Sequence, residues 1–409
     1  MLGIICIVWL IHIDKKTISH IKNKIIDNKS LFISSAFFLF GATISIFTSV
    51  DIRTALGEWK AFYIEPFIFF LILISISSLQ NVVNKNKKQK SFLDITFHLS
   101  SYQLTKTIIS ALLLSAFCTS LLAIYQHFTG WLVPYDFWAN RDTYRVTAWY
   151  GFPNAVGLFF APVFILGLYF FINKSYKIQD TNKSQKINSK LFFKYCILSV
   201  SCILLLTTFL FAIIYAKSTG ALIGIATGIC FLLFIWKRTR WFILVASIIA
   251  LVGLFALPND NAIRQELFMQ DRSGQLRIEM WAETSAYLFE HPLRGTGLAS
   301  YSERIAPYRI QKNIEIFHHP HNLLLTLWVN TGFIGLFGFL WLVVIVMRMF
   351  IVTTKQIDKT FFIATLITIF TTGLVDSPYI KNDLAFLFWT IVALFLIASY
   401  DKNMENKKT

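Results

Sequence analysis

Charged residues are scarce in this sequence. Only 15% of its 409 residues are Asp, Glu, Lys or Arg, whereas 56% are hydrophobic. A soluble domain has about 45–50% apolar and about 25% charged residues. The apolar excess falls in blocks whose lengths approach the ~20 residues that cross a bilayer as a helix. The lack of charge therefore excludes an ordinary soluble domain and predicts an all-α, polytopic integral membrane protein.

Cysteine is also rare, and the five cysteines all lie inside apolar segments. None has the spacing of a disulfide framework or of a zinc site. We interpret them as small side chains that face lipid or the protein core. They are Cys6, Cys118, Cys196, Cys202 and Cys230.

Eleven apolar segments are candidates for transmembrane helices. Backbone groups in lipid must be satisfied within the segment, so each segment is expected to be helical. The segments are 1–13, 31–50, 58–79, 107–130, 149–173, 195–216, 220–236, 241–257, 321–347, 360–375 and 384–400. The first is too short to span comfortably, and it lacks the basic start and cleavage site of a signal peptide. A start that has lost part of a first helix, and one helix before it, would make the complete bundle one of 12 helices.

The net charge of +16 arises from 38 basic residues against 22 acidic ones. Most basic residues lie in short loops between apolar blocks, which indicates membrane topology and argues against nucleic acid as a partner. The basic segments are 14–30, 80–106, 174–194, 237–240, 348–359 and 401–409. They alternate with three segments that carry few basic residues, 51–57, 131–148 and 376–383. The positive-inside rule places the basic segments and the C-terminus in the cytoplasm.

This topology divides the chain into four parts. Residues 1–257 hold eight membrane segments, and residues 258–320 form a large extracytoplasmic loop. Residues 321–400 hold the last three segments, and residues 401–409 form a cytoplasmic tail.

The outer loop is expected to contain an amphipathic helix over residues 275–289. Two series of residues recur there at spacings of three or four. They are Leu276, Met280, Glu283 and Tyr287, and Ile278, Trp281, Ser285 and Leu288. The following sequence HPLRGTG contains a proline and two glycines, which predict a turn.

Arginine supplies six of the seven cations in the outer loop. A guanidinium is planar and permanently charged, and it binds phosphate through paired hydrogen bonds. This bias predicts a phosphorylated ligand. The alternative is that these side chains are solvated or paired with Glu279, Glu283 or Glu303. The seven cations are Arg264, Arg272, Arg277, Arg294, Arg304, Arg309 and Lys312.

Five short motifs lie between about residues 145 and 395. They are GFPNAVGLFFAPVF from Gly151, KSTGALIG from Lys217, RIEMWAETSAYLFEHPLRGTGLASY from Arg277, HNLLLTLWVNTGFIG from His321 and VDSPY from Val375. Together they resemble the O-antigen ligase/O-antigen polymerase family. The His-Asn and Arg-Trp elements are the most specific part of this resemblance.

The resemblance implies a glycosyltransferase on the outer face of the bacterial cytoplasmic (inner) membrane. Its donor would be a glycan on undecaprenyl diphosphate. Its acceptor would be a sugar hydroxyl on lipid A–core or on a growing glycan, and some relatives glycosylate proteins. The family needs no metal, cofactor or nucleotide, so the expected partners are the donor, the acceptor and membrane lipids.

His321 is the expected catalytic base, because an imidazole can take the proton of the acceptor hydroxyl near neutral pH. Asn322 is expected to orient His321 or to cap the following helix. Arg277 is expected to stabilise the negative charge of the diphosphate leaving group. The alternatives are an interfacial histidine and an ion pair of Arg277 with Glu279 or Glu283.

Other residues are weaker candidates for substrate binding. The family carries an arginine in a Ser-Arg-Gly element, where this sequence has Ser218, Thr219 and Gly220, so the preceding Lys217 is the candidate replacement. The further candidates are Arg272, Arg141, Arg145, Asn322 and His319.

A zinc site is a further alternative for the histidines near residue 320. His318, His319 and His321 with Glu315 offer suitable ligand types. Pro320 interrupts the helical spacing, and we therefore predict no metal and assign His319 to the wall of the pocket.

Three charged residues lie in or near the third apolar segment. Glu58 and Lys60 are expected at the membrane interface. Glu65 is deeper, and we expect it to be paired or protonated, because charge at membrane depth is costly.

A polytopic transporter or flippase for a lipid-linked or anionic substrate is the alternative function. Transporters place polar groups at the membrane midplane in repeated halves. The sequence shows no convincing internal repeat, and its polar groups gather in one outer loop. This pattern favours an enzyme over a transporter, and the His-Asn motif argues against a non-catalytic scaffold.

Overall fold

The structure is a computed structural model that describes Gly3, Trp9 and residues 15–83, 101–140, 143–181, 189–312, 317–352 and 357–405. The described residues form helices and connecting segments, without strands. The early helices are α2 (Lys15–Asp27), α3 (Lys29–Thr48), α4 (Ile52–Glu58), the π-helix η1 (Trp59–Ile64), α5 (Glu65–Val83), α7 (Ser101–Thr129), α8 (Asp136–Ala139), α9 (Pro153–Thr181) and α10 (Ser189–Tyr215). The later ones are α11 (Thr219–Ile235), α12 (Arg240–Ala256), α13 (Ala262–Leu267), α14 (Arg272–Glu290), α15 (Tyr301–Ile305), η2 (Ala306–Tyr308), α16 (Leu323–Val352), α17 (Ile357–Thr372) and α18 (Asn382–Glu405).

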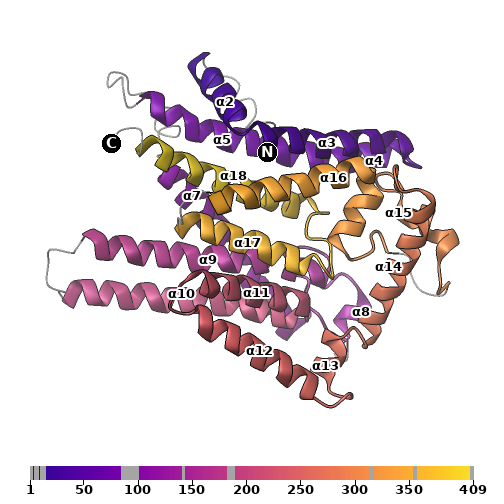
Figure 1. Ribbon diagram of the computed structural model, residues 1–409. Helices are drawn as coiled ribbons and strands as arrows, with labels where there is room; N and C mark the ends of the chain where they lie inside the picture. The colour runs from indigo at the N-terminus through magenta and orange to yellow at the C-terminus, as the bar shows by residue number, and fades with distance from the viewer. Residues whose placement is uncertain are drawn as a thin grey trace. The chain divides into compact units, whose positions relative to one another are not determined.

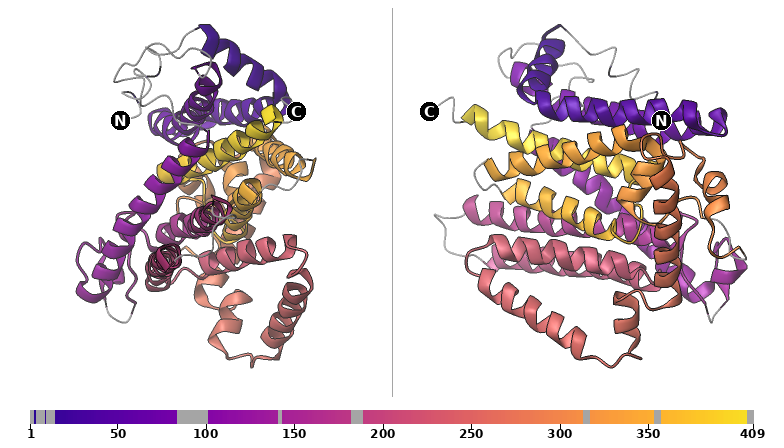
Figure 2. Two further views of the ribbon diagram at one scale, coloured as in Figure 1. Left: turned by 90° about the vertical axis from the view of Figure 1, so that its left-hand side faces the viewer. Right: turned by 45° about the vertical axis from the view of Figure 1, so that its right-hand side comes forward.

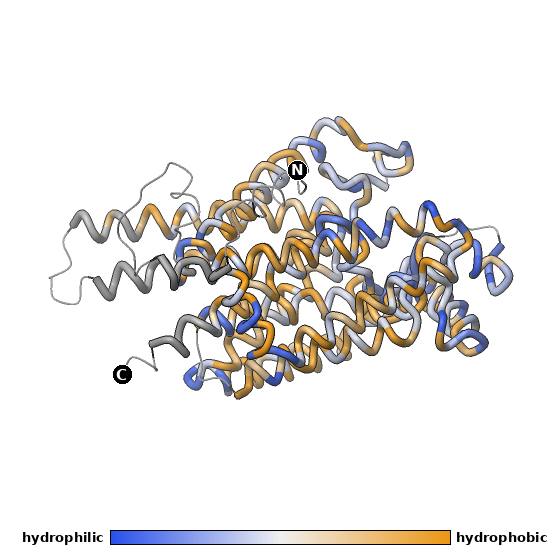
Figure 3. Tube along the Cα trace, turned by 90° about the horizontal axis from the view of Figure 1, so that it is seen from above, coloured by the Kyte–Doolittle hydropathy of each residue, from blue (hydrophilic) through white to orange (hydrophobic). Residues whose placement is uncertain are grey.

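Ten of the eleven apolar segments coincide with helices, and segment 1–13 lies outside the described residues apart from Gly3 and Trp9. Seven helices are long and apolar enough to cross a membrane, and α11 and α12 are shorter apolar helices. Figure 3 shows that the helices are mostly hydrophobic and that hydrophilic residues gather in connecting segments. The prediction of an all-α polytopic membrane protein is confirmed.

The chain forms two compact units. The first comprises residues 1–72, 230–354 and 373–390, and the second comprises residues 73–229, 355–372 and 391–409.

In the first unit, α3 runs along α16 (Figures 1 and 2). The backbones approach so closely that a Cβ on Gly41 would lie 2.3 Å from the Gly335 nitrogen. A Cβ on Gly338 would lie 2.3 Å from the Phe38 nitrogen. Small residues allow such close helix packing in membranes, so Gly335 of the His-Asn motif has a packing role.

Aromatic rings fill the core between these helices and the start of α18. The Phe38 ring lies 5.4 Å from the rings of Tyr63 and Phe339 and 5.5 Å from that of Tyr379. The Trp389 indole donates a hydrogen bond to the Tyr379 hydroxyl over 3.1 Å. This core fixes residues 373–381, which precede α18.

The second unit is a bundle in which α9 contacts α7, α10 and α17. Close packing again depends on glycine. A Cβ on Gly167 would approach Leu206 to 2.9 Å, and one on Gly228 would approach the Thr368 hydroxyl to 2.3 Å. α9, α10 and α17 lie side by side in Figures 1 and 2.

The predicted amphipathic helix is present as α14, three residues longer at its start and one at its end. The first predicted series supplies most of the buried face, and the second supplies only Leu288 to it. Met280, Glu283 and Tyr287 are buried, whereas Ile278 and Ser285 of the other series are exposed. The core beneath this face includes Tyr287, Leu288, Tyr301, Ile305 and Val329.

The charged residues near the third segment are partnered. The Lys60 Nζ lies 3.5 Å from a carboxylate oxygen of Glu65, which confirms that Glu65 is paired. The Glu58 carboxylate accepts a hydrogen bond from the Ala299 nitrogen over 2.9 Å, and this bond ties α4 to the GTGLASY sequence of the outer loop.

Candidate active site

His321 stands two residues before α16 in a tightly held turn. Its backbone φ is +48°, a left-handed conformation that is uncommon outside glycine. The Asn322 side-chain oxygen accepts a hydrogen bond from the Leu325 nitrogen over 3.1 Å and so caps α16. The Asn322 amide donates to the Leu374 carbonyl over 3.0 Å. The capping role expected for Asn322 is therefore confirmed.

The segment that Asn322 holds carries Asp376. The Leu323 nitrogen donates to the Gly373 carbonyl over 2.7 Å, and the hydroxyls of Thr326 and Ser377 are 2.7 Å apart. These contacts bring the turn before α18 against the start of α16.

The central contact of the site joins the His321 Nδ1 to the Asp376 Oδ1 over 3.0 Å. The two side chains are 16% and 10% exposed, respectively. An ionised carboxylate can only accept hydrogen bonds, so Nδ1 must carry the proton. When the imidazole is neutral, this arrangement leaves the Nε2 lone pair available as a base.

The Asp376 carboxylate stays ionised well into acid. Burial alone would raise its pKa, but the charge and hydrogen bond of His321 act in the opposite direction and prevail. The permanent charge of Arg277 lowers this pKa further, and so does His319 in acid strong enough to protonate it. The pKa of Asp376 is therefore held below its usual range, and its negative charge remains available to orient His321.

His319 lies beside this pair. Its ring centroid is 4.7 Å from that of His321, and its Nδ1 is sealed from solvent without a hydrogen-bond partner among the described residues. Burial, followed by repulsion from His321, lowers the pKa of His319 to about 3. His319 is therefore a neutral group within the site.

Ligand atoms of His319, His321 and Asp376 lie within 4.8 Å of one another, and these residues could hold a metal ion. This set differs from the histidine cluster considered from the sequence, because His318 is exposed and Glu315 lies outside the described residues. Two imidazoles and a carboxylate suit zinc. However, such an ion would have to displace the proton that His321 shares with Asp376, or bind through other ligand atoms.

Arg277 projects from α14 one helical turn before Trp281. The Trp281 indole donates to the Pro320 carbonyl over 2.9 Å and so ties α14 to the residue preceding His321. One guanidinium nitrogen of Arg277 donates to the Ser273 hydroxyl over 2.9 Å. Its Nε is buried without a partner among the described residues. The spacing between Arg277 and Trp281 therefore brings a cation close enough to lower the pKa of Asp376.

The alternative partners of Arg277 are otherwise engaged. Glu283 pairs with Arg309 over 3.6 Å, and Glu279 accepts a hydrogen bond from Gln311 over 2.8 Å. Within the part of the chain that the structure describes, Arg277 has no carboxylate in ion-pair contact. Among the described residues, the alternative of an ion pair with a glutamate is therefore found for Arg309 and not for Arg277.

A break in α16 receives the turn that follows α14. Gly332 has φ +63° and ψ −175°, a region that is open essentially to glycine alone. The Val329 carbonyl accepts hydrogen bonds from the nitrogens of Thr296 and Gly297 over 2.7 and 3.2 Å, and the Phe333 nitrogen donates to the Leu293 carbonyl over 3.0 Å. Backbone hydrogen bonds therefore connect the HPLRGTG turn to the break in α16 within the His-Asn motif.

Residues 202–340 match the family model described as O-antigen ligase. This match is consistent with an O-antigen ligase/polymerase family. It covers about a third of the chain and contains α14, Arg277, His321 and the Gly332 break. A comparison with curated proteins gave no match.

The O-antigen ligase segment and the apolar helices together support an O-antigen ligase-type membrane enzyme, a glycosyltransferase-like protein of the bacterial inner membrane. Asp376 lies beyond the matched residues. Sequence reasoning did not select it as a site residue, although its motif VDSPY was noted, because only the folded chain brings the Gly373–Leu374 backbone to Asn322 and Leu323.

The O-antigen ligase segment also includes Lys217, which belongs to the second unit. Its side chain is exposed, and its backbone φ is +49°. Arg145 holds this turn, because its guanidinium donates to the carbonyls of Ala216 and Lys217 over 2.9 and 3.2 Å. Arg145 also donates to the Asn154 side chain over 2.6 Å.

The remaining candidates are less informative. Arg272 is the first residue of α14 and is exposed, and Arg141 lies outside the described residues. Substrate binding by Arg272, Arg141, Arg145, Lys217, Asn322 and His319 stays a prediction.

Proposed function

We propose that this O-antigen ligase-type protein transfers a glycan from undecaprenyl diphosphate to a sugar hydroxyl on the outer face of the membrane. The observation that carries the proposal is the 3.0 Å contact between the His321 Nδ1 and the Asp376 Oδ1. In the neutral form of His321, this contact keeps the proton on Nδ1 and leaves Nε2 as the proton acceptor. It is the orientation expected of a general base held by a buried carboxylate.

The proposed step forms one bond and breaks one. The oxygen of the acceptor hydroxyl attacks the anomeric carbon of the donor sugar and forms the new glycosidic bond. The bond between that carbon and the phosphate oxygen breaks, and undecaprenyl diphosphate leaves with the electron pair. The hydroxyl proton passes to His321 Nε2, and the Asp376 carboxylate stabilises the resulting imidazolium.

Arg277 is proposed to bind the diphosphate. Charge accumulates on the leaving group as the sugar–phosphate bond breaks, and a fixed cation stabilises that charge where bulk water is limited. The absence of a carboxylate partner for Arg277 among the described residues, together with its buried Nε, supports this role.

A metal-assisted reaction at His319, His321 and Asp376 is the rival chemistry, because these three groups are close enough to share an ion. The proposal predicts transfer that persists when EDTA removes divalent metals. Loss of transfer in EDTA with recovery on adding zinc would favour the rival.

The test in cells uses a deletion of the gene that encodes this chain. Plasmids that express the unchanged protein restore the glycan phenotype, whereas His321→Ala and Arg277→Ala are expected to fail at normal protein levels. Arg304→Ala is the matched control from the same outer segment. Restoration by His321→Ala or Arg277→Ala would contradict the role given to that residue.

The deletion also identifies the acceptor. Unattached full-length chains in the deletion strain indicate a ligase, and chains of a single repeat unit indicate a polymerase. Loss of a glycoprotein indicates protein glycosylation.

A further inference from the structure

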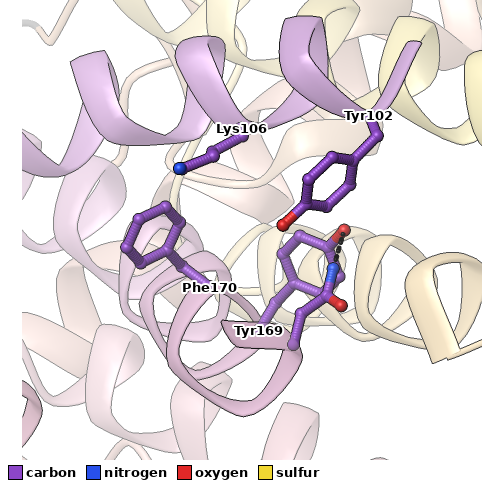
Figure 4. Close-up of a pocket in the computed structure, with 5 residues that line it drawn as sticks. Tyr102, Lys106, Tyr169 and Phe170 are labelled. Carbon is purple, nitrogen blue, oxygen red and sulfur yellow. Dashed lines mark hydrogen bonds between the residues drawn. The ribbon is translucent and has the colours of Figure 1, made fainter. Parts of the chain in front are cut away.

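A pocket lies between α7 and α9 in the second unit. Its lining comprises Tyr102 and Lys106 from α7 and Tyr169, Phe170 and Asn173 from α9. Figure 4 shows the side chains of Tyr102, Lys106 and Tyr169 gathered around a common space, with the Phe170 ring at its side. None of these residues belongs to the candidate active site.

The inner wall of the pocket is fixed by a polar network. The Asn173 amide donates to the Tyr169 hydroxyl over 2.9 Å, a bond drawn in Figure 4. The buried Tyr169 ring lies 5.6 and 5.3 Å from the rings of Phe361 and Phe362 in α17. The Asp358 carboxylate lies against Tyr169. Tyr169 is therefore held in place, while Tyr102 and Lys106 are exposed at the rim.

The pocket stands where two candidate membrane spans end. One span begins at Tyr102, and the other ends at Asn173. The pocket therefore lies at the level where hydrocarbon gives way to lipid headgroups. The segments 80–106 and 174–194 next to these ends are rich in lysine, which assigns this end to the cytoplasm.

We propose that this pocket binds the phosphate diester of an anionic phospholipid from the cytoplasmic leaflet. The Lys106 ammonium supplies the charge, and the Tyr102 hydroxyl and the second N–H of Asn173 supply hydrogen bonds. The Phe170 ring offers an apolar wall for the glycerol backbone and the start of an acyl chain. Basic pockets between membrane helices recognise headgroups through this combination of groups.

Nearby charges are compatible with an anion. The Asp358 carboxylate is directed at Tyr169 on the inner wall, whereas Lys106 is exposed at the rim. Lys106 therefore leaves a positive charge at the rim. The alternative is that tyrosine and lysine here serve only as interfacial anchors, which interact with any headgroup.

The test measures lipid binding to the purified full-length chain in detergent. Phosphatidylglycerol is added in defined amounts, and bound lipid is counted by native mass spectrometry. Phosphatidylcholine and inorganic phosphate are the comparison ligands. The variants are Lys106→Gln and Tyr102→Phe, and Lys237→Gln is the control because Lys237 is exposed in another short basic loop.

The proposal expects phosphatidylglycerol to bind more tightly than phosphatidylcholine. It expects Lys106→Gln to weaken that binding by about fivefold, the effect of one lysine near a charged surface, and Lys237→Gln to leave it unchanged. Equal binding of the two lipids, or equal loss in both lysine variants, would show an interfacial anchor only and overturn the proposal. Inorganic phosphate that binds as tightly as phosphatidylglycerol would overturn the lipid assignment. Melting temperatures identify any variant that fails to fold. If Lys106→Gln fails to fold, Tyr102→Phe replaces it as the test, and unchanged phosphatidylglycerol binding by Tyr102→Phe would overturn the proposal.

Lipid binding at this pocket does not depend on which reaction the outer site catalyses, so a failure of glycan transfer would leave this assignment unaffected.

Discussion

At the scale of single residues, Asp376 decides how His321 functions. A neutral histidine without a fixed partner exchanges its proton between two ring nitrogens, whereas the carboxylate at 3.0 Å keeps that proton on Nδ1. The negative charge also stabilises the imidazolium that forms during proton transfer. Asp376 therefore acts through His321 as a positioning residue.

Asp376→Asn is expected to lower kcat by about a hundredfold or more, within the range of general-base catalysis, with a smaller change in KM. An asparagine is uncharged and can present its amide to the ring in either orientation. It therefore no longer holds the His321 proton on Nδ1 and does not stabilise the imidazolium. The measurement is the steady-state rate of glycan transfer. Asp260→Asn, which removes an exposed carboxylate between α12 and α13, should leave kcat unchanged. A full rate in Asp376→Asn would contradict the orienting role.

His319 gives the protein a dependence on pH. Its folded-state pKa of about 3 lies below the ordinary value of 6.5, so the unfolded chain takes up a proton that the folded chain refuses. Stability therefore falls as pH drops from about 6.5 toward 3. Asp376 and the rings of His318 and His321 are the titratable groups that contribute to this shift.

His319→Asn is expected to lose less thermal stability than the unchanged protein when the pH is lowered from 7 to 5. The measurement is the melting temperature in detergent with EDTA present. His318→Asn, at an exposed neighbouring ring, is the control and should keep most of the dependence, because His318 makes the smallest contribution to the shift. An identical pH dependence in all three proteins would show that His319 is not the group responsible.

At the scale of elements, the outer site depends on the break in α16. Only glycine adopts the Gly332 backbone angles without large strain, and a Cβ there would approach the Leu293 carbonyl to 2.4 Å. The break exposes the Val329 carbonyl to the turn at Thr296. It therefore couples the end of α14 to the helix that begins at His321.

Gly332→Ala is expected to lower the free energy of unfolding by about 2 kcal/mol through backbone strain, and to reduce transfer. Gly253→Ala is the matched control, because a Cβ at Gly253 in α12 would meet nothing within 4 Å. That variant should be stabilised by about 0.5–1 kcal/mol. Denaturation of both purified proteins provides the measurement. Equal stabilities would contradict the role of the break.

The helices also show which structural features the sequence could predict. Apolar length located ten helices, with ends that differ by up to eight residues, and periodicity located α14, because both signals are local. The sequence could not show which of the two equally spaced series on α14 is buried, because only tertiary packing exposes Ile278 and buries Met280. The contact between His321 and Asp376 spans 55 positions and depends on a turn held by backbone hydrogen bonds. No local pattern could specify it.

At the scale of the whole molecule, the topology inferred from the basic loops makes a separate prediction. In a cysteine-free background, Ser285→Cys on the exposed face of α14 should react with a membrane-impermeant maleimide in spheroplasts. Lys237→Cys should react only after the membrane is permeabilised. The opposite pattern would place α14 in the cytoplasm and exclude an outer-face reaction.

The two compact units carry different groups of interest. The first holds His321, Asp376 and Arg277, and the second holds the Lys217 turn and the pocket at Lys106. Variants in these groups therefore separate glycan transfer from lipid binding, and each assignment can be tested without the other.

The most direct test measures glycan transfer by the purified full-length chain in proteoliposomes with EDTA present. Lipid-linked glycan extracted from the native host's membranes serves as the donor. The unchanged protein is expected to transfer glycan without added metal. His321→Ala is expected to lower the rate by about a hundredfold or more, while its melting temperature is preserved. A His321→Ala protein that transfers glycan at the unchanged rate would show that His321 is not the base.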